Sequence, residues 1–198
     1  SIVADAREAM DYEMLKNDVL KVFAIEVPFN EEKFRGSKEN ILSEDLAQVA
    51  LDTFRRRMDT LANTANPVIQ KVFSEKGNMF ENILIPISDG KRVYNIAVNL
   101  RRAAESNCKE VIKEFEKRML LFVIDDEWKE HLRQLDDLKR SVQNASYEQK
   151  DPLLIYKLES FNIFRQMLDS LNRRAIAILL RGQIPMQDSN NVQQASQE

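Results

Sequence analysis

The chain has 198 residues, of which 43% are hydrophobic and 31% are charged, and it contains only four glycines. This composition is typical of a helix-rich soluble protein that forms one domain or two small ones. Lys and Arg number 29 against 32 for Asp and Glu, so the nearly balanced charge gives no general reason to expect a nucleic-acid partner.

The first part of the chain is predicted to be helical. Apolar residues recur at helical spacing over residues 5–22, and Pro28 then breaks the pattern. A second helix is expected over residues 43–62, with Asp45 near its start and an end close to Pro67. Its apolar face comprises Leu46, Val49, Ala50, Phe54, Met58 and Leu61.

Residues 82–98 predict a β-hairpin instead. Two β-branched runs flank Asp89 and Gly90, a pair that favours a two-residue turn in which both positions have positive φ. Pro86 cannot donate a ladder hydrogen bond, so its strand should lie at a sheet edge. In this register one face carries Ile83, Ile85, Ile87, Tyr94 and Ile96. A lone hairpin is marginal in water, so this one should pack on the helices.

The second half of the chain predicts a long helical hairpin. Three- and four-residue apolar steps from Asn99 to Val142 indicate one helix of about 40 residues, roughly 60 Å long. Asp151 and Pro152 are a good N-cap and first helical residue for a second helix, which should end at Gly182. Its predicted seam consists of Leu154, Leu158, Phe161, Phe164 or Arg165, Leu168, Leu171, Ala175 and Ile178. Residues 143–150 then form the tip, where a single aromatic side chain, Tyr147, has nothing to bury against.

The stretch over residues 124–168 resembles the two-helix finger in the helical scaffold domain of the SecA family, the ATP-driven motor subunits of bacterial preprotein translocases. The matching residues are Asp125, Trp128, His131, Leu132, Asp136, Leu138, Tyr147, Gln149, Lys150, Asp151, Pro152, Tyr156, Lys157, Glu159, Ser160, Phe161, Phe164, Met167 and Leu168. Residues 5–118 are more loosely similar to the helical wing domain of the family, with the hairpin as an insertion.

We expect a mainly α fold with three parts. The resemblance implies a helical wing over 1–118 and a two-helix finger over 119–182, and the Gln-, Asn- and Ser-rich composition of the chain end indicates a disordered tail over 183–198. In the finger, the core is expected to contain Trp128, His131, Leu132, Leu135, Phe161, Phe164 and Leu168. At the tip, contacts with the preprotein and the channel are expected from Ser146, Tyr147, Glu148, Gln149 and Lys150.

In mechanical terms, the resemblance implies that the finger couples ATP-driven motion of upstream nucleotide-binding domains to the movement of an unfolded preprotein through the SecY channel. The protein would then be cytoplasmic and peripherally associated with the inner membrane. ATP and Mg²⁺ would belong to the full-length family, because the glycines at 36, 77, 90 and 182 cannot form a phosphate-binding P-loop. No cofactor and no catalytic residue are therefore expected in this chain.

Other chemistry has little support in the sequence. Because the chain has one cysteine, it cannot form an internal disulfide. With one cysteine and one histidine, it also has too few thiol and imidazole ligands for a tight zinc site. A dyad of Cys108 and His131 would be separated by about 35 Å along one helix. The longest apolar runs have six residues, too few for a membrane span. The start at Ser1 rather than methionine suggests a piece of a longer protein.

Several alternatives stay open. One alternative explains Tyr147 as an inert loop residue, and another explains the whole chain as a coiled-coil adaptor or dimerisation module without a translocase role. The arginine clusters at 55–57, 101–102 and 173–174 have acidic neighbours, which favours solvated faces with i,i+4 pairs over nucleic-acid binding. Cationic residues near the tip could favour an anionic membrane surface; they are Lys139, Arg140, Lys150 and Lys157.

Overall fold

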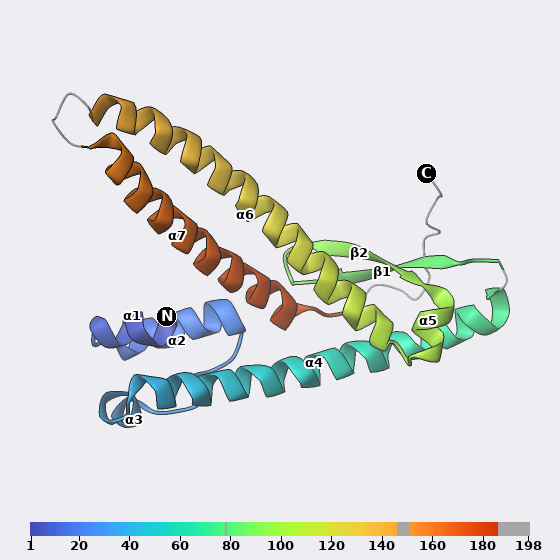
Figure 1. The fold of residues 1–198 in the computed structure, drawn as a ribbon. Coiled ribbons are helices and arrows are strands. Elements are labelled where there is room, and N and C mark those ends of the chain that lie inside the picture. The colour runs from blue at the N-terminus through green and yellow to red at the C-terminus, as the bar shows by residue number, and fades with distance from the viewer. Residues whose placement is uncertain (78, 146–150, 186–198) are drawn as a thin grey trace. The chain divides into compact units, whose positions relative to one another are not determined.

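A computed structural model of the chain describes residues 1–77, 79–145 and 151–185. The described part is mainly helical with one two-stranded antiparallel sheet, which confirms the predicted fold class (Figure 1). In chain order the elements are α1 (Ile2–Glu8), α2 (Tyr12–Phe23), α3 (Glu31–Gly36), α4 (Glu39–Lys76), β1 (Asn82–Ser88), β2 (Val93–Asn99), α5 (Leu100–Glu105), α6 (Lys109–Ala145) and α7 (Pro152–Arg181).

The chain divides into two compact units. Unit 1 contains residues 1–118 together with the chain from Ile176 onward, and unit 2 contains residues 119–175. The N-terminal core of unit 1 joins α1, α2, α3 and the start of α4. It is built from Val3, Ala6, Leu15, Val19, Phe29, Phe34, Leu42 and Leu46.

The single helix predicted over residues 5–22 is two helices. Met10 adopts a left-handed conformation with φ 52° and ends α1. The amide of Asp11 donates to the Ala6 carbonyl at 3.0 Å, and the amide of Met10 donates to the Arg7 carbonyl at 3.1 Å. This is a Schellman arrangement, which satisfies carbonyls at a helix end. The Asp11 carboxylate then accepts from the Met14 amide and begins α2.

Helix α4 does not end near Pro67 as predicted but continues to Lys76. A proline inside a helix removes one backbone hydrogen bond and costs about 3 kcal/mol. Packing offsets this cost, because Ala65 and Ile69 on either side of Pro67 are both buried. The side-chain amide of Gln70 also donates to the backbone carbonyl of Ala104 in α5 at 2.8 Å.

The hairpin forms where it was predicted, but its turn is longer. Ser88 pairs with Val93, so the loop has four residues, and only Gly90 has positive φ. The Asp89 carboxylate organises this loop by accepting from the amides of Lys91 and Arg92, both at 2.8 Å. Lengthening the loop by two residues leaves the side-chain alternation unchanged. The predicted shared face is therefore confirmed, with Ile85 opposite Ile96 and Ile87 opposite Tyr94.

Strand β1 has a second neighbour at its outer edge. Ser88 and Gln183 exchange backbone hydrogen bonds of 2.8 and 2.9 Å, so the chain after α7 pairs with β1. Gln183 was predicted to begin a disordered tail, and it is instead bonded to the sheet. Because amides alternate along a strand, Pro86, two residues before Ser88, also has its nitrogen on the side away from β2. This position explains why the sheet tolerates a proline.

The helix predicted from Asn99 to Val142 is interrupted once. Asn107 and Cys108 have φ values of 49° and 67°, and they separate α5 from α6. The Cys108 amide donates to the Ala103 carbonyl at 2.9 Å, which closes a second Schellman turn. The Ser106 hydroxyl then accepts from the Glu110 amide at 3.0 Å at the start of α6.

Candidate functional site

Unit 2 consists of two antiparallel helical segments that lie side by side, residues 119–145 of α6 and residues 152–175 of α7 (Figure 1). We call this pair the arm. Asp151 caps the second segment, because its carboxylate accepts from the Leu153 amide at 2.9 Å. Pro152 is the first helical residue, which confirms the predicted helix start.

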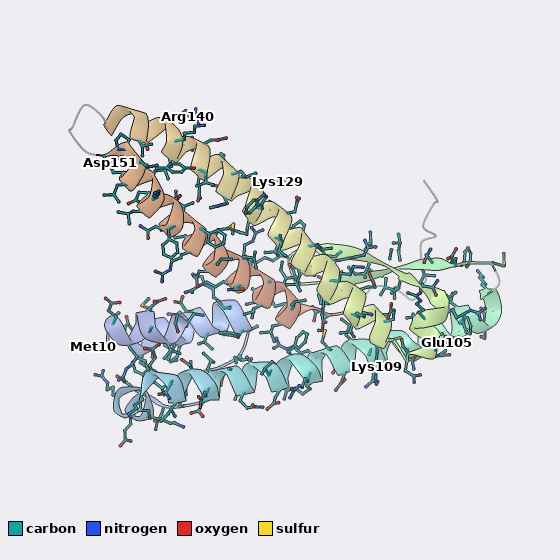
Figure 2. All side chains as sticks on the ribbon, in the orientation of Figure 1. Met10, Glu105, Lys109, Lys129, Arg140 and Asp151 are labelled. Atoms are coloured by element: carbon teal, nitrogen blue, oxygen red, sulfur yellow. The ribbon has the colours of Figure 1, made fainter. Side chains whose placement is uncertain are left out.

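The predicted contact residues at the tip are Ser146, Tyr147, Glu148, Gln149 and Lys150, and all five lie outside the described residues. The structure therefore describes the two helices that lead to the tip. Figure 2 shows Arg140 and Asp151 at the same end of the arm, with Lys129 nearer its middle.

Four buried residues of α6 in the arm are spaced four positions apart: Met119, Val123, Glu127 and His131. Val142 of α6 is also buried, and α7 contributes Met167 and Ala175. His131 is only 4% exposed, and its ring lies 5.4 Å from the Trp128 ring and 5.7 Å from the Phe164 ring between centroids. His131 therefore has a structural position between the two helices, as predicted for it.

The other side chains predicted for the core of the arm are not buried in this chain. Trp128 is 47% exposed and Phe161 is 60% exposed, and Leu135 is partly buried. The further exposed members of the predicted core and seam are Leu132, Leu154, Leu158, Phe164 and Leu168. Helix α7 has apolar residues on more than one face, and Met167 belongs to the face that is covered. Two helices alone bury only one stripe of each, so the predicted seam is corrected from Leu154 to Leu168, whereas Ala175 of the same seam is buried.

An ion pair joins the two helices at the inner part of the arm. The Arg174 guanidinium on α7 binds Glu127 and also Asp126, the latter at 2.6 Å, both on α6. The hydrogen bond to Glu127 is the largest influence that raises the pKa of Arg174. The sequence indicated only solvated i,i+4 pairs for this cluster, which holds for Arg173 with Asp169 but not for Arg174. Arg174 and Glu127 are 47 positions apart in the sequence, so no local sequence pattern indicated their contact.

The outer surface of α6 carries exposed charges paired along the helix. Arg133 binds Glu130 at 2.5 Å and Asp137 at 3.3 Å, and Arg140 binds Asp137 at 2.5 Å. Of the cations considered for an anionic membrane surface, Arg140 is thus already paired, whereas Lys139 and Lys157 are exposed. Lys150 lies outside the described residues.

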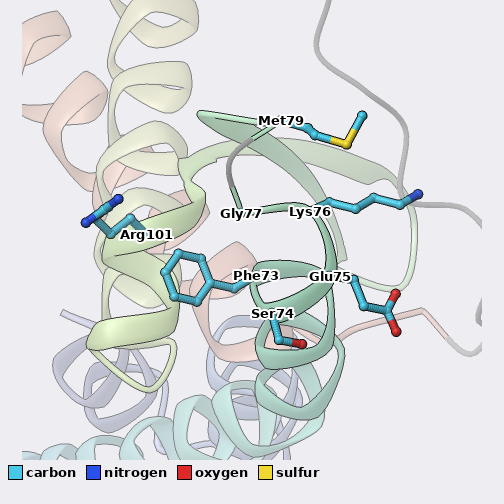
Figure 3. Close-up of a pocket in the computed structure, with 7 residues that line it drawn as sticks. All are labelled: Phe73, Ser74, Glu75, Lys76, Gly77, Met79 and Arg101. Carbon is cyan, nitrogen blue, oxygen red and sulfur yellow. The ribbon is translucent and has the colours of Figure 1, made fainter.

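Unit 1 has a small pocket at the C-terminal end of α4. Its volume is about 130 Å³, and Figure 3 shows Phe73 pointing towards Arg101 while Glu75 points away. Small-molecule sites usually enclose about 300–1,000 Å³, so this pocket is too small for one. In the residues that the structure describes, no three His, Cys, Asp or Glu side chains gather as a metal site requires. Nor does any helix in the described ranges combine the length and apolarity needed to cross a membrane.

A family model described as the SecA wing and scaffold domain matches residues 2–183. This chain belongs to the SecA wing and scaffold family. The match covers both units and confirms the resemblance that was first recognised in the finger sequence.

Curated SecA relatives extend over nearly the whole chain. One, named protein translocase subunit SecA, from Bacteroides thetaiotaomicron, is 55% identical over 186 residues, covering 94% of this chain and 17% of the relative. That of Phocaeicola vulgatus is 51% identical over 195 residues, covering 98% of this chain and 18% of the relative. The chain thus spans less than a fifth of the length of these relatives. No solved structure matches it.

Proposed function

We propose that this chain is the wing and scaffold part of an ATP-driven protein translocase motor, and that its arm is the element that moves the preprotein. The observation that carries this proposal is the family match over residues 2–183, which includes both helices of the arm. The relatives are named protein translocase subunits, and the chain, which matches the wing and scaffold family, covers 17% and 18% of two of them.

The geometry of the arm suits the transmission of displacement. Residues 119–145 of α6 are continuously helical, which corresponds to about 40 Å of rigid length. The Arg174 guanidinium fixes α7 against α6 through two carboxylates. In this proposal, a displacement at the inner end of the arm is carried along the two joined helices towards their far end.

The tip supplies the contact in this proposal. Tyr147 offers an aromatic surface that accepts many side chains, as an unfolded preprotein of any sequence requires. Ser146, Glu148, Gln149 and Lys150 would share that contact and meet the SecY channel. Upstream nucleotide-binding domains of the same polypeptide would hydrolyse ATP with Mg²⁺, and the motor would act at the cytoplasmic face of the inner membrane.

The proposal is tested by Tyr147→Ala in the full-length protein, with Tyr147→Phe as the matched control. Transport of a preprotein into membrane vesicles should fall at least tenfold for the alanine variant and stay close to normal for phenylalanine. Basal ATP hydrolysis should be nearly unchanged in both variants, because the tip is not part of a nucleotide site. Equal loss of transport and ATP hydrolysis would refute the assigned role of the tip.

The exposed apolar side chains on the arm favour a second candidate, a dimerisation module. Leu121, Trp128 and Phe161 are exposed on helices that would bury them on self-association. Sedimentation of the chain over a range of concentrations distinguishes the two functions. Tight self-association that Phe161→Ser abolishes, together with no loss of transport in the same full-length variant, would favour the dimerisation module.

A further inference from the structure

Unit 1 contains a second, larger cavity, of about 540 Å³. It is formed by the middle of α4, the hairpin loop and the chain around the end of α7. The polar side chains that line it include Arg56, Arg57, Thr60, Thr64, Asp89 and Arg181. Its volume lies within the range of about 300–1,000 Å³ that is usual for small-molecule sites.

Two of the three arginines are held in place by helix ends. Arg57 donates to the carbonyls of Leu180 and Ala24, the latter at 2.9 Å. Arg181 donates to three carbonyls at the end of α2, those of Leu20, Lys21 and Val22. The negative end of a helix dipole favours such cations, and these bonds fix both guanidinium groups beside the cavity.

The third arginine is free to bind something else. Among the residues that the structure describes, the Arg56 guanidinium has neither a hydrogen-bond partner nor an ion-pair partner. Its neighbour Arg55 is different, because it pairs with Asp52 at 3.4 Å and does not line the cavity. The sequence-based expectation of solvated ion pairs for residues 55–57 is therefore correct for Arg55 alone.

The lining contains one carboxylate, that of Asp89, and it is hydrogen-bonded within the hairpin. Asp89 accepts from the amides of Lys91 and Arg92 and from the Tyr94 hydroxyl, each at 2.8 Å. Burial is the largest single influence on the pKa of Asp89 and raises it, but these hydrogen bonds together lower the pKa below its usual value. The carboxylate is therefore ionised at neutral pH, and with three arginines and one carboxylate the lining side chains carry a formal net charge of +2.

The arginines repel one another across the cavity. The pKa of Arg57 is lowered, first by burial and then by the charges of Arg56 and Arg181. A bound anion would replace this repulsion with attraction. Guanidinium groups match phosphate and carboxylate oxygens through paired hydrogen bonds, which makes converging arginines a usual site for such groups.

We propose that this cavity binds a small multivalent anion carrying phosphate or carboxylate groups, with Arg56 as the principal clamp and Arg57 and Arg181 as fixed positive walls. This site is separate from the translocation role proposed for the arm. Because its lining comes from α4, the hairpin loop and the end of α7, a bound anion would also tie these three segments of unit 1 together.

Isothermal titration calorimetry of the 198-residue chain at low ionic strength tests the proposal, with inorganic pyrophosphate and citrate as separate probes. We expect saturable binding of at least one probe, weakening as salt is added. Binding of pyrophosphate alone would identify phosphate as the recognised group, and binding of citrate alone would identify carboxylate. Arg56→Gln should weaken binding by about tenfold or more, since it removes a charge-assisted contact.

Arg55→Gln is the matched control and should bind like the unaltered chain. Circular dichroism melting curves of both variants should coincide with that of the parent, because neither side chain is buried. The proposal is overturned if neither probe saturates, or if the two variants lose affinity equally while keeping their melting curves.

Discussion

The ion pair across the arm gives a prediction whose size follows from its burial. Arg174→Met removes the partner of Glu127, whose side chain is only 10% exposed. Losing one partner of a fully buried pair costs about 3–5 kcal/mol, whereas exposed pairs contribute about 0–1 kcal/mol. Arg174 itself is 38% exposed, so solvent screens part of the effect and we expect a loss of about 2 kcal/mol.

Thermal unfolding followed by circular dichroism measures this loss, which should lower Tm by about 4–8 °C for a chain of this size. Arg133→Met is the matched control, because Arg133 also binds two carboxylates, but on the exposed surface of a single helix. Its Tm should stay close to that of the parent. If both variants lose the same stability, the Arg174 pair does not hold the helices together and the reasoning is wrong.

Three further predictions concern packing and exposure. The Cβ added by Gly182→Ala would lie 2.6 Å from the Phe115 ring, so this variant should lose about 1–3 kcal/mol of unfolding free energy, measured by urea denaturation. Gly36→Ala is the control and should keep its unfolding free energy, because nothing lies within 4 Å of the added Cβ. Burial raises the pKa of the Cys108 thiol to about 11, so iodoacetamide at pH 8 should label it slowly in the native chain and rapidly in urea; fast native labelling would contradict its burial. Trp128→Ala should lower the unfolding free energy by about 1–2 kcal/mol in urea denaturation, because the indole is half exposed. A loss above about 3 kcal/mol would show that the indole belongs to the buried core.

Local chemistry made parts of the fold predictable. The N-cap Asp151 and the following Pro152 identify the start of α7 without any tertiary information. The hairpin face was predicted because side chains along a strand alternate between the two faces. The loop is two residues longer than expected, and an even change in loop length leaves this alternation unchanged. The interruption at Asn107 also had a local signal, because asparagine adopts the left-handed conformation more readily than most residues.

Other features depend on tertiary packing and had no local signal. Met10 is an unusual residue for a left-handed helix end, and Pro67 lies within a helix that buried neighbours stabilise. On α7, periodicity shows which residues share a face, but not whether a partner covers that face. The stripe with Leu158 and Phe161 was therefore as good a candidate seam as the covered one with Met167.

The candidate functional site was likewise predictable only where the sequence carries a local pattern. The resemblance pointed to the tip from the residue pattern around it; the family match confirms the family, and the contact role of the tip stays a prediction. The Arg174 contact and the convergence of Arg57 with Arg181 join residues far apart in sequence, so only the three-dimensional structure shows them.

Photocrosslinking from position 147 tests the central claim most directly. A photoreactive amino acid would replace Tyr147 in the full-length protein, with the channel and a stalled preprotein present, and Lys129 on the exposed middle of α6 would be the control position. We expect adducts to the preprotein or the channel from position 147 and far fewer from position 129. Adducts from position 147 only to this protein's own wing, or to a second copy of the chain, would contradict the account and favour the dimerisation module.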